Sequence, residues 1–77
     1  MKNLVEIRTE YITLGQLLKF ENIVESGGFV KEFLATSTIK VNGLLENRRG
    51  KKLYHNDVIE IEGFGTYAIV NNGIKES

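Results

Sequence analysis

The stretch "SGGFVKEFLATSTIKVNG", residues 26–43, contains a change of hydrophobic period that decides the fold. Three of its apolar side chains follow the i, i+3, i+4 spacing of a helix face, namely Val30, Phe33 and Leu34. Residues 38–41, "TIKV", then alternate apolar and polar side chains as a half-buried strand does. Asn42-Gly43 favours a type I′ hairpin turn, because both residues tolerate positive φ angles. The stretch therefore predicts a helix that leads into a β-hairpin.

The residues before this stretch predict another helix and one strand. In "TLGQLLKFENI", residues 13–23, Thr13 and Gln16 have the spacing of a capping box, and leucines form one helical stripe. Residues 4–8, "LVEIR", alternate as a strand. Ser26 is a favoured N-cap residue, so we expect the second helix to begin there.

The residues after it predict further strands. These are residues 44–47, which complete the hairpin, the alternating "DVIEIEG" of residues 57–63, and "TYAIV", residues 66–70. The order is thus one strand, two short helices and a run of strands. This order is typical of an α+β domain in which two packed helices lie against a small, largely antiparallel sheet.

Composition limits the organisation of the chain. Its 77 residues, 42% hydrophobic and 26% charged, are expected to form a single globular domain over residues 1–77. There is no cysteine for a disulfide or thiolate metal site, no apolar run that could span a bilayer and no signal-peptide core, so we expect a cytoplasmic protein.

The charge is unevenly distributed along a chain whose formal net charge is zero. Residues 40–55 hold five cations against one carboxylate, and four of those cations lie in "NRRGKKL", residues 47–53. Such a run is either a solvated loop or a surface that binds phosphate.

Little in the sequence indicates catalysis, and we expect no enzyme, metal, cofactor or small-molecule substrate. His55 is the sole histidine and has the context of a turn residue. "SGGF" and "GFG" lack the pattern of a phosphate-binding loop. Gly27 and Gly28 nevertheless leave the backbone N–H groups of the second helix accessible to a phosphate, although a flexible start of the helix is the alternative interpretation.

Taken in order, "SGGFVKEFLATSTIKVNG" and "NDVIEIEG" resemble the S4-type RNA-binding domain, named for ribosomal protein S4 and also called the alpha-L motif. The resemblance covers about residues 12–62. The residues that fall on the spacing of the family pattern are Ser26, Val30, Leu34, Ile39, Val41, Asn42 and Gly43, and those that match its end are Asp57, Val58 and Ile59. "ITLGQLLK", "ESGG" and "NRRGKKL" resemble the small stand-alone bacterial members of this family. The chain departs from the family pattern at four positions: Gly27 replaces an arginine, Val30 an alanine, Ser37 a glycine and Asn56 the glycine before Asp57.

The resemblance implies the alpha-L fold and a monomeric module that binds structured RNA, such as ribosomal or tRNA-like RNA. The implied contact residues are Ser26, Gly27, Gly28, Lys31, Lys40, Asn42, Arg48, Arg49, Lys51 and Lys52. Tyr54 or Phe29 could stack on a base, but a core position is the favoured interpretation of each. A protein-interaction adaptor that meets an acidic partner, or a DNA-associated factor, is the alternative function.

Overall fold

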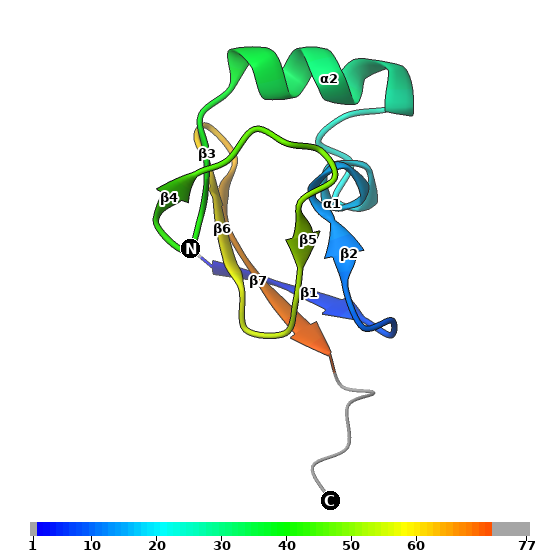
Figure 1. Cartoon of the computed structure of the whole chain (residues 1–77), viewed down its shortest axis with the longest axis vertical. Helices are drawn as coiled ribbons and strands as arrows, with labels where there is room; N and C mark the ends of the chain where they lie inside the picture. Colours follow the sequence, from blue (N-terminus) through cyan, green and yellow to red (C-terminus); the bar gives the residue numbers. More distant parts are fainter. Residues whose placement is uncertain (1, 72–77) are drawn as a thin grey trace, which may run out of the picture.

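The computed structural model describes residues 2–71, which form two helices and seven strands (Figure 1). The helices are α1 (Leu14–Phe20) and α2 (Gly27–Thr36). The strands are β1 (Lys2–Ile7), β2 (Ile12–Thr13), β3 (Ile39–Val41), β4 (Leu44–Leu45), β5 (Lys52–Leu53), β6 (Val58–Ile61) and β7 (Gly65–Asn71). The predicted α+β class and order of elements are confirmed.

A five-stranded sheet in the order β1-β7-β6-β3-β4 forms the larger layer, and β2 and β5 form a separate two-stranded sheet. The pairs β7–β6, β6–β3 and β3–β4 are antiparallel, whereas β1 lies parallel to β7. The prediction of a largely antiparallel sheet is therefore confirmed. The sequence analysis did not include β2 and β5, because two residues are too short to show a period.

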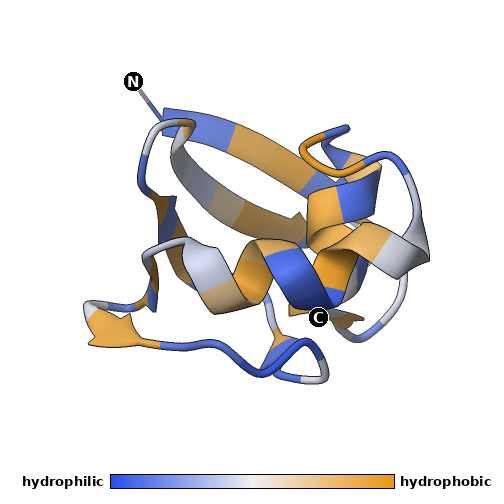
Figure 2. Ribbon diagram, turned by 90° about the horizontal axis from the view of Figure 1, so that it is seen from above, coloured by the Kyte–Doolittle hydropathy of each residue, from blue (hydrophilic) through white to orange (hydrophobic). Residues whose placement is uncertain are grey.

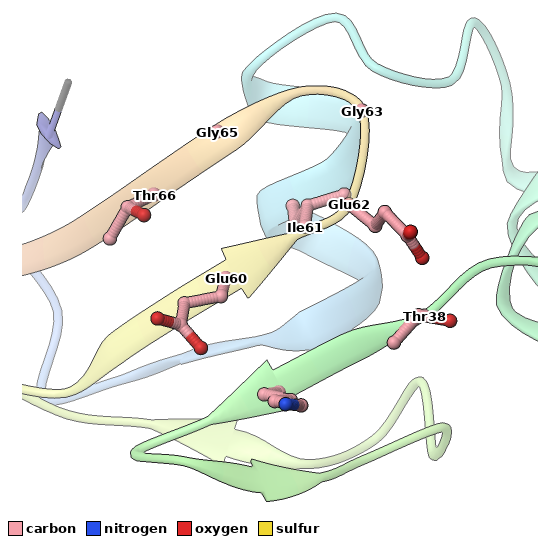
Figure 3. Close-up of a pocket in the computed structure, with 8 residues that line it drawn as sticks. Thr38, Glu60, Ile61, Glu62, Gly63, Gly65 and Thr66 are labelled. Atoms are coloured by element: carbon pink, nitrogen blue, oxygen red, sulfur yellow. The ribbon is translucent and has the colours of Figure 1, made fainter.

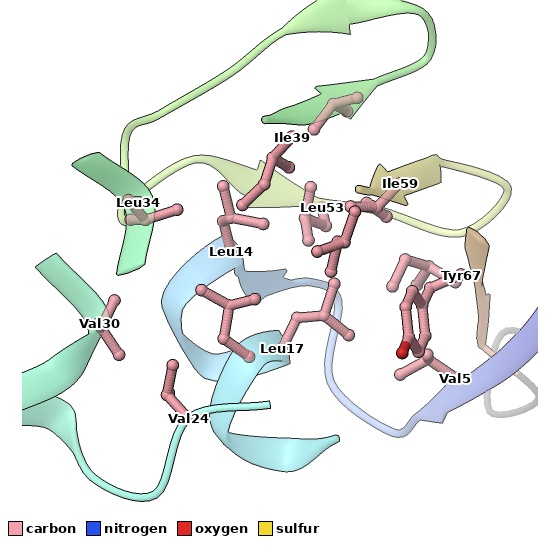
Figure 4. Close-up of a cluster of buried hydrophobic side chains, with 14 of the residues drawn as sticks. Val5, Leu14, Leu17, Val24, Val30, Leu34, Ile39, Leu53, Ile59 and Tyr67 are labelled. Atoms are coloured by element: carbon pink, nitrogen blue, oxygen red, sulfur yellow. The ribbon is translucent and has the colours of Figure 1, made fainter. Parts of the chain in front are cut away.

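One hydrophobic core joins the helices to the sheet (Figure 4). α1 contributes Leu14, Leu17 and Leu18, and α2 contributes Val30 and Leu34. Val24 and Leu53 also belong to the core, and alternate residues of the larger sheet complete it: Val5, Ile7, Ile39, Val41, Ile59, Ile61, Tyr67 and Ile69. Because strand side chains alternate between faces, the residues between these point away from the helices and leave the other face of the sheet open.

The ends of the helices explain where the prediction differs from the structure. The capping box at Thr13 is confirmed: its Oγ1 accepts from the backbone N–H of Gln16 (3.2 Å), and Gln16 Oε1 accepts from the N–H of Thr13 (2.9 Å). α1 ends at Phe20, three residues earlier than predicted, and Asn22 adopts a positive φ of 59° that a helix cannot continue. Ser26 is the N-cap residue of α2, but its side chain makes no capping hydrogen bond.

The two candidate stacking aromatics are not in the core. Phe29 is 55% exposed and Tyr54 is 42% exposed, so the favoured interpretation of both as core residues is wrong. Phe29 directly precedes Val30, so it lies about 100° around α2 from that buried residue, and its side chain is exposed. Tyr54 lies just beyond the end of β5. The hydrophobic period alone does not reveal this, because the core is already filled by aliphatic side chains.

Asn42 and Asp57 fasten the hairpin to β6. Asn42 and Gly43 have φ angles of 53° and 87°, as the type I′ turn requires. The Asn42 side chain donates to Asp57 Oδ1 and accepts from the N–H of Val58, both at 3.0 Å. Asp57 Oδ2 accepts from the N–H of Tyr54 at 2.7 Å. Asn42 of the Val-Asn-Gly turn and Asp57 therefore act together, because their hydrogen bonds hold the hairpin against the start of β6.

Replacing Asn42 by alanine should therefore destabilise the fold by more than the cost of placing an alanine at a positive φ angle, because it also removes two side-chain hydrogen bonds. Asn22 provides a matched control, because it has a similar positive φ of 59°. We expect Asn42→Ala to lower the free energy of unfolding by about 2 kcal/mol more than Asn22→Ala, since two hydrogen bonds are lost and one of them is to a carboxylate. Urea unfolding measures both, and equal losses would contradict a fastening role.

Candidate nucleic-acid interface

The basic loop, residues 46–51, is attached to the first turn of α1. The N–H groups of Leu14 and Gly15 donate to the carbonyl oxygens of Lys51 and Arg49, each at 2.9 Å. The first N–H groups of a helix have no partner within the helix, so the loop satisfies two of them. The loop therefore runs from β4 past the helices to β5 in a defined position (Figure 1). In Figure 2 it is the mainly hydrophilic stretch beside α2.

Gly15 permits this close approach. A Cβ atom at this position would lie 3.4 Å from the Cβ and the carbonyl oxygen of Arg49, and 3.4 Å from Cγ1 of Val30. Glycine in a helix costs about 1 kcal/mol relative to alanine. This cost is offset because Gly15 allows α1, α2 and the basic loop to come together at one point.

Two shallow hollows flank Arg49 at this meeting point, and we call them together the basic groove. One is lined by Thr13, Gly15, Gln16, Lys19, Val30, Arg49 and Gly50. The other is lined by Lys31, Leu34, Ala35, Asn47 and Arg49. Within the part of the chain that the structure describes, three cations and no carboxylate line the groove. Glutamates, in contrast, line the hollow on the open sheet face and the hollow on the other flank of α2.

Lys31 and Arg49, both predicted, lie in this groove, and the predicted glycines lie close to it. Lys19, which the sequence analysis omitted, lines it too. Its Nζ is 3.9 Å from the position that a Cβ of Gly27 would occupy, so it lies beside the N-terminus of α2. The signal in the sequence is that Lys19 follows Gly15 by four residues, which places both on one face of α1.

Arg48 is held by a carboxylate. Its Nε and Nη2 donate to Glu46 Oε2 and Oε1 at 2.8 and 3.2 Å, and its backbone N–H donates to Oε2 at 3.1 Å. These hydrogen bonds from Arg48 lower the pKa of the Glu46 carboxyl from 4.5 to about 2. Glu46 therefore offsets one of the four clustered cations and shapes the start of the basic loop.

Lys52 lies at the far end of the run, on β5. Its Nζ is 4.9 Å from the centroid of the Tyr11 ring, and that ring is 5.6 Å from the ring of Tyr54. The cation thus rests on one aromatic face beside a second, partly exposed aromatic ring. Lys51 is half-buried, and its carbonyl oxygen is the one bound to α1.

The structure does not bring Lys40 into the basic groove. Lys40 pairs across the sheet with Glu60, and the two line a hollow on the open face together with Glu62. Figure 3 shows the two glutamates at this hollow. Asn42 lies in the hairpin and uses both polar ends of its side chain within the fold. His55 occupies the predicted turn, where its Nδ1 accepts from the N–H of Asn71 at 2.9 Å.

Residues 2–71 contain no group of three or more His, Cys, Asp or Glu side chains that could hold a metal ion. Within the same range, no helix is long and apolar enough to cross a membrane.

The alpha-L arrangement agrees with comparisons with known proteins. The S4 domain family matches residues 5–70, so the chain belongs to the S4 domain family. It is also similar to a protein of Bacillus subtilis (strain 168) named "Probable ribosome maturation protein RlbA", with 52% identity over 71 residues that cover 92% of this chain and 100% of the relative. The assignment made from the sequence to the S4-type RNA-binding domain is confirmed.

Glu46→Gln should destabilise the protein in a manner that depends on pH. A carboxyl whose pKa is lowered in the folded state contributes stability above its ordinary pKa of 4.5, and the contribution is lost as the pH falls toward 2. We expect a loss of about 1 kcal/mol at pH 7, since the Arg48 side chain is 71% exposed, and a vanishing difference from the parent near pH 2. Urea unfolding between pH 2 and 7 tests this, with Glu62→Gln as control. A difference that is the same at every pH would contradict it.

Proposed function

We propose that this protein is a non-catalytic module that binds structured ribosomal RNA in the cytoplasm during maturation of the ribosome. Membership of the S4 domain family supports RNA as the ligand. The name of the relative, a probable ribosome maturation protein, supports the ribosome as the setting. The basic groove is the proposed contact surface.

The observation that carries this proposal is the position of Arg49 between Lys19 and Lys31 in a groove without carboxylates. None of the three cations forms an ion pair with another described residue, so their charge is available to a ligand. A guanidinium can hold a phosphate or a base edge through two hydrogen bonds, while lysines add point charge. Three such groups between two helices suit a folded RNA backbone, which is recognised largely by its shape and phosphates.

The N-terminus of α2 extends the proposed surface. Gly27 and Gly28 are exposed, and Lys19 lies beside them. Backbone N–H groups at this end of a helix favour an anion. These amides would supply the contact that the arginine of the family pattern makes where this chain has Gly27.

The salt dependence of RNA binding tests the groove. We expect the triple variant Lys19→Ala, Lys31→Ala, Arg49→Ala to reduce the slope of log affinity against log salt by about 2, because each phosphate contact contributes about 0.7. The measurement is a fluorescence anisotropy titration against ribosomal RNA fragments at several salt concentrations.

The matched control removes three exposed cations outside the groove, in Lys2→Ala, Arg8→Ala, Lys40→Ala. It changes the net charge equally and should keep the slope of the parent within about 0.5. Equal losses in the two triple variants would show that the groove is not the binding surface. Equal affinity of the parent for duplex DNA would instead favour the DNA-associated alternative.

Gly28→Ala tests the amides of α2. An added Cβ would meet only Ser26 Oγ, at 3.8 Å, so the fold should tolerate it and gain up to about 1 kcal/mol of helix propensity. RNA affinity should nevertheless fall severalfold, because the methyl group stands where a phosphate would approach. Thermal unfolding and the same titration measure the two effects. Unchanged affinity would leave the glycines as a flexible start of the helix.

A further inference from the structure

The flank of α2 that faces away from the basic groove carries a different surface. Residues at i, i+3, i+4 and i+7 line a hollow there: Phe29, Glu32, Phe33 and Thr36. The segment between the helices completes the hollow with Ile23, Val24 and Glu25. Lys31 and Ala35 line the groove on the other flank, so α2 separates two hollows of different chemistry.

Aromatic rings dominate this second surface. Phe29 is 55% exposed and Phe64, in the turn between β6 and β7, is 51% exposed. The ring of Phe33 connects to that of Phe64 in an edge-to-face contact, with centroids 5.7 Å apart. Three of the four phenylalanines of the chain therefore gather here: Phe33 packs against the core, whereas Phe29 and Phe64 are largely exposed. Clustered exposed apolar side chains of this kind mark interaction surfaces.

The charge of this surface is negative. Glu25 and Glu32 line the hollow, and within residues 2–71 no lysine or arginine lines it. Neither glutamate forms an ion pair with a described residue. We call Phe29, Phe33, Phe64, Glu25 and Glu32 together the acidic aromatic face.

We propose that the acidic aromatic face binds a basic, arginine-containing segment of a protein partner. Charge complementarity selects this occupant, because carboxylates repel the phosphates of RNA and attract a cation. An arginine can pair with a glutamate while its guanidinium plane lies on a phenylalanine ring, and apolar side chains of the segment would cover the remaining aromatic surface. The domain would thus hold RNA on one flank of α2 and a basic protein segment on the other.

The probe is a synthetic, fluorescently labelled nine-residue peptide of alternating arginine and leucine, titrated with the full chain in the absence of RNA. We expect saturable binding by the parent. Glu25→Gln with Glu32→Gln, and separately Phe29→Ala, should each weaken binding about tenfold, since ion pairs or a cation–π contact are lost. Phe29 is largely exposed, so its replacement should leave the circular dichroism spectrum unchanged.

The control variant Glu10→Gln with Glu60→Gln removes the same charge from exposed positions elsewhere and should bind the peptide as the parent does. Both glutamine variants should keep the affinity of the parent for ribosomal RNA within about twofold. Three results would overturn the proposal: no peptide binding by the parent, equal losses in the two glutamine variants, or a dimer in sedimentation that Phe29→Ala dissociates. The last result would identify a second copy of the chain as the occupant.

Discussion

The backbone contact between the basic loop and the first turn of α1 is the constraint on which the proposed RNA-binding surface depends. Gly15 leaves room for this contact, because a Cβ atom there would lie 3.4 Å from both Arg49 and Val30 of α2. Through this contact the two helices, which supply Lys19 and Lys31, share one groove with a loop that lies far along the chain. The loop contributes little to the core. Its position matters because it fixes where Arg49 stands relative to the two lysines.

The hydrophobic period of the sequence was sufficient to predict most of the fold. Both helices, the hairpin at Asn42-Gly43 and the strands β6 and β7 follow from spacing and turn chemistry. The pairing of strands cannot be predicted in this way, because a hydrophobic period of two identifies the buried face of a strand but not the strand beside it. The parallel pairing of β1 with β7 therefore could not be predicted, and neither could the pairing of the two-residue strands β2 and β5.

The candidate site was predicted less completely, because side-chain partners depend on the path of the loop. The run of cations indicated the right segment, yet only the structure shows that Glu46 holds Arg48 while Arg49 makes no ion pair with a described residue. Lys40 adjoins the hairpin in sequence, but strand alternation turns it toward Glu60 on the open face. Lys19 joins the groove from thirty residues upstream, a proximity that packing of the helices creates.

The pairing of β1 with β7 also bears on how the chain acquires its structure. β1 is an edge strand whose neighbour in the sheet is the last described strand, so their contact closes a loop that spans almost the whole chain. Contacts this distant in sequence form late and slow the folding of small domains. During synthesis, β1 cannot pair with its neighbouring strand until β7 has emerged. The helix pair and the hairpin depend on local contacts, so they can form before β1 pairs with β7.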